Sequence, residues 1–228
     1  MTSPNPQDDC ASPRWVAWHR QYADPRHALS RRLRDIQEQI GAYLDAAAPG
    51  DLSVLSLCAG QGDDLLGVLS THPARARVRA HLVELEAGNV AIARDRIFQL
   101  GLDRVEIHQA DAGFSDTYAA LVPADLVLAC GVFGNVTDEA VAVTVAALPQ
   151  LCAGNATVLW TRHRRRPDLT PSINEWFATA GFEQLRLYSP DRNGFAVGTH
   201  RLVGDPQPLR SGERWFSFVD ETGVDGSR

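Results

Sequence analysis

The sequence contains no lysine, because all 22 of its basic side chains are arginine. Without a lysine amine the chain cannot form a Schiff base with a substrate or with pyridoxal phosphate, and it cannot supply the lysine of a phosphate-binding P-loop. Its four cysteines lie far apart and have no C-x-x-C spacing. This spacing argues against a zinc site or a disulfide framework and favours free thiols in a reducing cytoplasm.

Long hydrophobic runs and excess positive charge are also absent. No uninterrupted run of about 18 apolar residues occurs, so we expect no transmembrane helix. The polar residues 1–13 lack the order of a secretion signal and are expected to form a disordered tail. The formal net charge of −6 argues against nucleic acid or an anionic membrane as a partner. We therefore expect a cytoplasmic protein.

What the sequence does contain is a regular alternation of apolar segments, with 44% apolar residues overall. A helix is expected within 14–49, because one apolar stripe recurs there at steps of three and four. Further on, the expected strands are 52–58, 78–84, 104–109, 124–130 and 156–163, and the helices between them are 62–70, 88–100 and 137–150. Continuous apolar strands separated by helices are typical of a parallel sheet that is covered on both faces.

The last third of the chain changes pattern. A helix is expected at 171–181, and the strands 182–188 and 195–203 are joined by a short turn, which predicts an antiparallel pair. We therefore expect an α/β fold with a doubly wound, mostly parallel seven-stranded sheet and a terminal antiparallel hairpin.

Candidate ligand-binding residues follow three of the expected strands. The stretch LSLCAGQGD (55–63) places Gly60 and Gly62 after the first strand, and Leu65 stands where a dinucleotide fingerprint has its third glycine. Glu84 ends the second strand, where an acid can accept hydrogen bonds from both hydroxyls of a ribose. Asp111 follows the third strand, where an acid can face the exocyclic amine of a purine. Ligands bind beyond these strand ends in open parallel sheets.

This combination of glycine corner, two acids and terminal hairpin resembles a class I S-adenosylmethionine-dependent methyltransferase over roughly residues 50–203. The resemblance implies that S-adenosylmethionine is the cofactor, with its ribose held by Glu84. It also implies that Cys130 and Gly131, which follow the fourth strand, contact the cofactor. The full set of implied cofactor-binding residues is Cys58, Ala59, Gly60, Gly62, Asp63, Glu84, Leu85, Asp111, Ala112, Cys130 and Gly131.

The sequence also departs from the family pattern. Ser56 stands where the family has an acid, and Cys58 replaces its first glycine, so Asp63 or Asp64 is the candidate to replace the acid's contact. S-adenosylmethionine carries no phosphate, and a third glycine at position 65 is therefore not needed. Two acids at a helix start would repel a pyrophosphate, whereas they attract a sulfonium and an ammonium group. This asymmetry favours S-adenosylmethionine over a dinucleotide.

The resemblance implies a layout of a disordered tail (1–13), an N-terminal helical lid (14–49), a Rossmann-like methyltransferase domain (50–210) and a C-terminal tail (211–228). A general base is required only if the acceptor is a hydroxyl or a protonated amine. The candidate bases are His19, Tyr22 and His163, and the candidate substrate contacts are Trp15, Trp18, Phe133 and Asn135, with plain packing as the alternative role for the histidines and tryptophans. The run RHRRR (162–166) is interpreted as a solvated loop or an anion clamp.

The acceptor class is narrowed by two missing motifs. No H-D or D-x-x-D pair occurs at the expected strand ends, so no essential metal is expected. The N/D-P-P-Y/F signature after the fourth strand is replaced by CGVF, which favours a small-molecule acceptor over a nucleic-acid base or a protein amide. The hypothesis is a methyltransferase that modifies an oxygen or nitrogen atom of a small molecule. The sequence leaves the oligomeric state open, and a homodimer is one of the options. The alternatives are an S-adenosylmethionine-binding protein with non-methylating chemistry or no catalysis, and an NAD-dependent oxidoreductase.

Overall fold

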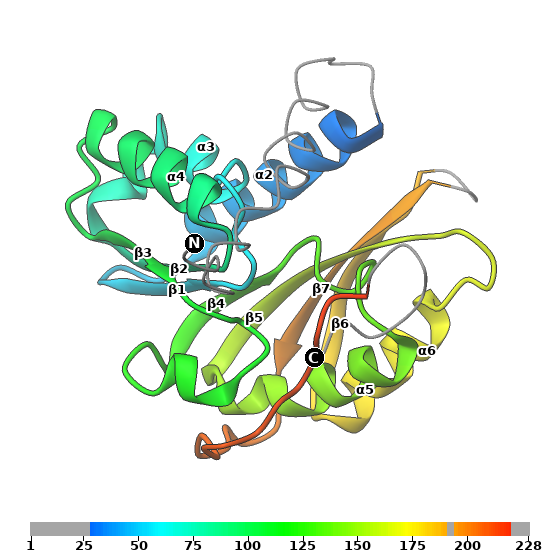
Figure 1. The fold of residues 1–228 in the computed structure, drawn as a ribbon. Helices are drawn as coiled ribbons and strands as arrows, with labels where there is room; N and C mark the ends of the chain where they lie inside the picture. Colours follow the sequence, from blue (N-terminus) through cyan, green and yellow to red (C-terminus); the bar gives the residue numbers. More distant parts are fainter. Residues whose placement is uncertain (1–27, 191–193, 220–228) are drawn as a thin grey trace, which may run out of the picture.

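The computed structural model describes residues 28–190 and 194–219, which form a sheet with helices on both faces (Figure 1). The helices of this part are α2 (Ala28–Ala46), α3 (Leu65–Leu69), α4 (Ala87–Gln99), α5 (Asp138–Ala147) and α6 (Thr170–Thr179). Its strands are β1 (Leu52–Ser56), β2 (Val78–Glu84), β3 (Val105–Gln109), β4 (Ala124–Ala129), β5 (Cys152–His163), β6 (Phe182–Tyr188) and β7 (Phe195–Leu202). Short 3-10 helices lie at η2 (Pro73–Arg77), η3 (Ser115–Tyr118) and η4 (Leu148–Gln150). None of the described helices is long and apolar enough to cross a membrane.

The seven strands lie in the order β3-β2-β1-β4-β5-β7-β6. All neighbouring strands pair in parallel except β7, which is antiparallel to both β5 and β6. This order confirms the doubly wound sheet and the terminal hairpin that the sequence predicted. The chain passes outward from β1 to β3 and then returns to β4 on the other side of β1. The strand order therefore reverses between β1 and β4, which is where ligands bind in such sheets.

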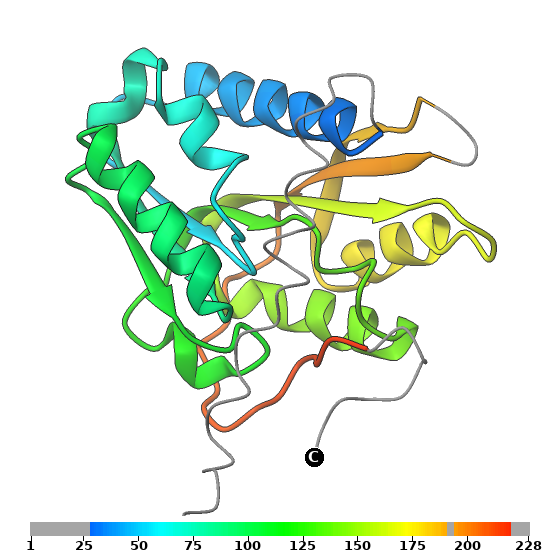
Figure 2. The same cartoon turned by 45° about the horizontal axis from the view of Figure 1, so that its top comes forward.

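Each face of the sheet has its own apolar core. Helices α2, α3 and α4 cover one face and α5 and α6 cover the other (Figures 1 and 2). On the second face, Trp160 of β5 is fully buried and stands opposite Gly198 of β7. A Cβ atom at position 198 would lie 2.2 Å from the Trp160 ring, so only glycine leaves room for this indole.

The connection from β3 to β4 gives the second face an unusual cover. The described residues between β3 and β4 form only one helix, the short 3-10 helix η3. On the first face, by contrast, the longer helix α4 packs against β2 and β3. Residues 203–219, the C-terminal segment, instead run along the second face. Trp215 and Phe216 in this segment are 3% and 4% exposed and belong to the same core as Trp160.

Local geometry explains where the element bounds differ from the expected ones. The helix expected at 62–70 shortens to Leu65–Leu69, because Gly62 has a φ of 71° and the side chain of Asp64 accepts a hydrogen bond from Leu65 N at the helix start. Strand β5 begins at Cys152 rather than at 156. The helix expected within 14–49 is described only for Ala28–Ala46.

Candidate functional site

The loop after β1 turns sharply at three left-handed residues. Cys58, Gly60 and Gly62 have φ values of 49°, 56° and 71°. Glycine adopts this region without strain, whereas a cysteine there costs on the order of 1–3 kcal/mol. Cys58 thus takes the conformation of the glycine that it replaces in the family pattern. A Cβ atom at Gly62 would lie 2.7 Å from Leu66 Cδ1 in the core below, so that position has no room for a side chain.

Strands on both sides hold this loop in place. Leu57 N donates a hydrogen bond to Leu128 O of β4 (2.9 Å), and Ala59 N donates to Val83 O of β2 (2.8 Å). The loop therefore continues both parallel ladders for a short distance before it turns. Its exposed surface lies at the carboxyl ends of β1, β2 and β4.

Glu84 connects the end of β2 to this glycine corner. Its Oε2 accepts a hydrogen bond from Gly60 N at 2.7 Å, and its Oε1 accepts one from Glu86 N at 2.8 Å. The side chain is buried. Each carboxylate oxygen has a second lone pair, so the group can accept further hydrogen bonds from a ligand. Two residues that the sequence predicted to share a site are therefore in direct contact.

Leu85 and Ala112, two of the implied cofactor-binding residues, differ in exposure. Leu85 is 64% exposed beside Glu84, which leaves an apolar side chain at the edge of the site. Ala112 is buried, and its carbonyl accepts a 2.6 Å hydrogen bond from the Tyr118 hydroxyl. Asp111 Oδ1 accepts from Gly113 N at 2.8 Å, while its Oδ2 lies 3.2 Å from Arg214 Nη2. One oxygen of Asp111 thus orders its own turn and the other meets the C-terminal segment.

The structure distinguishes the two acids that follow the corner. Asp63 forms a 2.6 Å ion pair with Arg96 of α4 and faces that helix. Asp64 caps α3, and burial raises the pKa of its carboxyl group to about 6, with the charge of Asp63 adding to the effect. The two candidates to replace the missing acid therefore differ: Asp63 is paired with Arg96, whereas the raised pKa of Asp64 leaves a fraction of its carboxyl groups protonated near neutral pH.

The two thiols of the site, Cys58 and Cys130, have raised pKa values. Burial raises the pKa of Cys58 well above its ordinary value, and the charges of Glu84 and Asp111 raise it further. Burial also raises the pKa of Cys130, to which the charge of Asp64 contributes. Because the thiolate is the reactive form, both side chains act as small packing groups at neutral pH.

The loop after β4 is tied to its surroundings by several polar contacts. Gly131 N donates to Thr161 Oγ1 of β5 (2.9 Å), and Asn135 Nδ2 donates to Gly131 O (2.6 Å). Asn135 O in turn accepts from Val219 N of the C-terminal segment. Phe133 is fully buried and packs against Trp160, with ring centroids 5.9 Å apart. The structure therefore places Phe133 in the core, whereas Asn135 shapes the loop.

His163 ends β5 beside this loop, close to Gly134. Burial lowers the pKa of its imidazole, and the charges of Arg162 and Arg165 lower it further. Its Nδ1 is buried and has no hydrogen-bond partner within the described residues. The ring is thus neutral at pH 7 and has a nitrogen available for a proton. The other predicted acceptor-side residues, His19, Tyr22, Trp15 and Trp18, lie outside the described residues.

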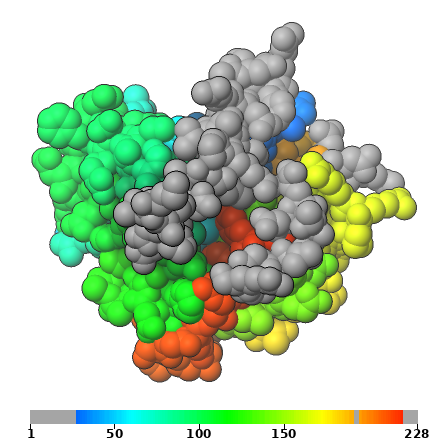
Figure 3. Space-filling view, in the orientation of Figure 1, coloured from blue at the N-terminus to red at the C-terminus, as the bar shows by residue number. Residues whose placement is uncertain are grey.

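The C-terminal segment brings side chains to the site that sequence reasoning missed, because 211–228 was expected to be a tail. Arg214 lies over the Phe114 ring, 3.6 Å from its centroid, and contacts Asp111. Trp215 stacks on Tyr118 at 5.4 Å. Part of the segment, in red, is visible in the centre of the face drawn in Figure 3. The signal for this packing was the aromatic cluster WFSF at 215–218, which is unusual in a solvated tail.

Comparison with known proteins supports the fold. No protein-family model and no curated protein sequence matches the chain. Among solved structures, it is similar to magnesium protoporphyrin IX methyltransferase from Synechocystis PCC 6803 with bound S-adenosylhomocysteine (TM-score 0.65, 14% identity, 86% of this chain and 96% of that one). It is also similar to the CurJ carbon methyltransferase (TM-score 0.65, 13% identity, 83% of this chain and 58% of that one). A third similar structure is an rRNA methylase from Streptococcus thermophilus (TM-score 0.56, 10% identity, 73% of this chain and 95% of that one). The chain therefore has the fold of the class I S-adenosylmethionine-dependent methyltransferases, as the resemblance predicted.

Proposed function

We propose that the protein transfers a methyl group from S-adenosylmethionine to an oxygen or nitrogen atom of a small molecule. The observation that carries this proposal is the contact between Glu84 and Gly60, which joins the ends of β1 and β2 where the strand order reverses. Similar folds occur in methyltransferases whose structures contain S-adenosylmethionine or S-adenosylhomocysteine.

The residues at these strand ends fit S-adenosylmethionine better than a dinucleotide. The carboxylates of Glu84 and Asp111 lie close enough to Cys58 of the corner to raise its pKa, and no lysine exists to bind a pyrophosphate. Negative charge attracts the sulfonium and ammonium groups of S-adenosylmethionine and repels phosphate. The exposed Leu85 offers an apolar surface to an adenine ring.

In this proposal the chain binds and aligns rather than reacting covalently. When bound, S-adenosylmethionine supplies an electrophilic methyl group whose leaving group is a neutral thioether. Glu84 holds the ribose hydroxyls, and the loop after β4 positions the acceptor. Alignment and exclusion of water then provide most of the rate enhancement. For a hydroxyl or ammonium acceptor, the imidazole of His163 is the proposed proton acceptor, because its lowered pKa favours the unprotonated form, alongside the predicted bases His19 and Tyr22.

The burial and ion pairing of the arginines in the run 162–166 favour a small-molecule acceptor over nucleic acid. Arg162 is buried and forms a 2.8 Å ion pair with Asp138, and Arg164 forms one with Asp168. Only Arg165 and Arg166 are exposed in this run. Phosphate backbones are bound by several free cationic side chains together, and two are too few for a nucleic-acid surface.

Binding and turnover measurements test the proposal. Calorimetric titration of the full chain with S-adenosylmethionine should give one site, and titration with NADH should give no heat. Incubation with a panel of small hydroxyl and amine compounds should then release S-adenosylhomocysteine in an acceptor-dependent manner. Binding without release with any acceptor would favour the non-methylating alternative, and binding of NADH in place of S-adenosylmethionine would overturn the proposal.

A further inference from the structure

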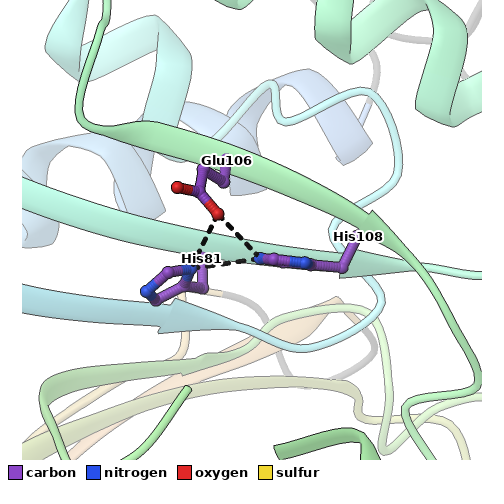
Figure 4. A group of neighbouring side chains, drawn as sticks. All are labelled: His81, Glu106 and His108. Atoms are coloured by element: carbon purple, nitrogen blue, oxygen red, sulfur yellow. Dashed lines mark hydrogen bonds and ion pairs between the residues drawn. The ribbon is translucent and has the colours of Figure 1, made fainter. Parts of the chain in front are cut away.

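Three side chains that can bind a metal ion meet on one face of the sheet, near its β3 edge. His81 lies on β2, and Glu106 and His108 lie on the neighbouring edge strand β3. His81 is directly opposite Glu106 in the parallel register, and His108 is two residues further along β3. Because side chains alternate along a strand, all three point to the same face (Figure 4).

Within residues 28–190 and 194–219, no helix packs on this face at this position. The alternate residues Ala80, Leu82, Val105 and Ile107 belong to the core under α4. The connection from β3 to β4, which would place a helix on the opposite face, contains only η3 among its described residues. His81 and His108 are accordingly half-buried and Glu106 is exposed, so an ion can reach them from solvent.

The three ligand atoms already form a suitable triangle. His81 Nδ1 lies 3.1 Å from His108 Nε2, and Glu106 Oε2 lies 3.9 Å from the former and 3.7 Å from the latter. In a tetrahedral zinc site with bonds of about 2.0–2.2 Å, neighbouring ligand atoms are about 3.4 Å apart. Each distance differs from this value by only a few tenths of an ångström. Rotation of the exposed Glu106 side chain can shorten its two distances, and a small outward rotation of the histidine rings can lengthen the third.

We propose that His81, Glu106 and His108 bind a divalent transition-metal ion of the zinc type, with a fourth position open to water. Two imidazoles and one carboxylate suit zinc and its neighbours, whereas magnesium and calcium prefer oxygen ligands. Glu106 also supplies the negative charge that a cation needs in a site close to Arg79. The site goes beyond the proposed methyl transfer and does not depend on it.

The bound ion would join the edge strand β3 to β2. Such a ligand stabilises the folded chain because the three side chains are brought together only by folding. At a hundredfold excess of free zinc over its dissociation constant, the melting temperature should rise by roughly 5–10 °C.

The test uses the full chain, free of affinity tags and treated with a chelator. Titration with Zn²⁺ should give one ion per chain in calorimetry, and Co²⁺ should give the visible absorption of a tetrahedral or five-coordinate site. The variants His81→Gln and His108→Gln should each weaken Zn²⁺ binding at least tenfold and, at the same zinc concentration, reduce the rise in melting temperature to about half or less. Glu106→Gln, which removes only the charge, should weaken binding to a smaller extent.

His72→Gln is the matched control, because His72 also faces a carboxylate, Asp45 at 3.3 Å, but has no third ligand in the part of the chain that the structure describes. This variant should bind zinc as the wild type does. A thermal melt of each variant in the presence of chelator shows whether it folds. If a histidine variant does not fold, Glu106→Gln still tests the proposal, because Glu106 is exposed and its substitution should not disturb the core. Absence of binding by the wild type, or zinc affinity that is unchanged in folded His81→Gln and His108→Gln, would overturn the proposal.

Discussion

Glu84 organises the glycine corner before any ligand arrives. Its two oxygens accept hydrogen bonds from the backbone N–H groups of Gly60 and Glu86, which belong to two different loops. A carboxylate that accepts two amide donors holds both loops at fixed distances from itself. The same group is therefore a positioning element for the corner as well as the proposed ribose contact, and its substitution should affect ligand affinity more than its exposed area suggests.

The isosteric change Glu84→Gln tests this residue. A glutamine has one acceptor oxygen and one NH₂ group, so one of the two backbone donors will face another donor, and an unmatched buried donor costs about 1–3 kcal/mol. We expect the dissociation constant for S-adenosylmethionine to rise about tenfold or more, measured by calorimetry.

The half-buried acid Glu183 on β6 provides the comparison for this change. Among the described residues it pairs with Arg201 on the neighbouring strand β7, and β6 is an edge strand well away from the corner. Glu183→Gln should leave the affinity for S-adenosylmethionine unchanged. Equal affinities for the wild type and Glu84→Gln would remove Glu84 from the cofactor site.

For single residues, the sequence predicted which residue types lie at the strand ends but only some of the contacts between them. That Glu84 and Gly60 lie close together followed from the expectation that their strands are neighbours in a parallel sheet. The ion pair between Asp63 and Arg96 did not, since nothing local indicates that α4 reaches back to the corner. Phe133 was expected at the substrate because it follows a strand end, yet its ring packs on Trp160. Side-chain direction in a loop depends on tertiary packing, which spacing in the sequence does not encode.

At the scale of chain segments, the C-terminal segment contacts two loops of the candidate site. It replaces a helix on the second face of the sheet, and backbone hydrogen bonds fix it at several points. Trp215 N donates to Gly113 O (2.8 Å), Ser115 N donates to Glu213 O, and Val219 N donates to Asn135 O. The segment therefore joins the turn after β3 to the loop after β4, and its position controls both.

Gly113→Ala should displace this segment. A Cβ atom at position 113 would lie 2.1 Å from the backbone oxygen of Phe216, which cannot rotate away as a side chain could. The segment carries Arg210 and Arg214, and trypsin can cleave this lysine-free chain only after arginine. We expect cleavage after these two residues to be about tenfold faster in the variant, because local detachment exposes the backbone. Timed digestion followed by mass spectrometry measures the rate.

Gly154→Ala is the control for this experiment, because an added Cβ atom there meets nothing within 4 Å. Its cleavage after Arg210 and Arg214 should match that of the wild type. If Gly113→Ala were cleaved at the same rate as this control, the packing of the C-terminal segment would not depend on the turn at Asp111.

Periodicity predicted the strands well because their apolar runs are continuous. It failed for the helix expected at 62–70, which the left-handed Gly62 and the cap at Asp64 confine to Leu65–Leu69. It also could not show that His81 and His108, 27 residues apart, would be in contact. That contact depends on strand pairing and on the missing helix after β3, which are properties of the assembled sheet.

On the scale of the whole molecule, the antiparallel end of the sheet contains a buried titratable group. His200 of β7 stacks on Phe177 with ring centroids 4.2 Å apart, and its Nδ1 accepts a 3.1 Å hydrogen bond from Trp160 Nε1. Burial lowers the pKa of His200 to about 4. The accepted hydrogen bond requires an unprotonated Nδ1, so protonation would set two donors against each other inside the core.

The stability of the fold should therefore decrease in mild acid. The unfolded chain binds a proton at His200 near pH 6.5, whereas the folded chain binds it only near pH 4, so the unfolded state holds more protons between these values. Stability is fully present above the unfolded pKa and is lost as the pH falls toward 4. From pH 7 to pH 5 this one group should lower the free energy of unfolding by about 2 kcal/mol. Asp64 has the opposite sign, because its raised pKa favours the folded state as the pH falls.

The variant His200→Gln separates the two contributions, because a glutamine oxygen can accept the hydrogen bond from Trp160 and does not titrate. Urea unfolding of both proteins, followed by tryptophan fluorescence at pH 7, 6 and 5, gives the free energies. We expect the wild type to lose about 2 kcal/mol more than the variant over this range. Parallel losses in the two proteins would show that His200 is not held neutral by the core, and acid sensitivity would then have to arise elsewhere in the sheet.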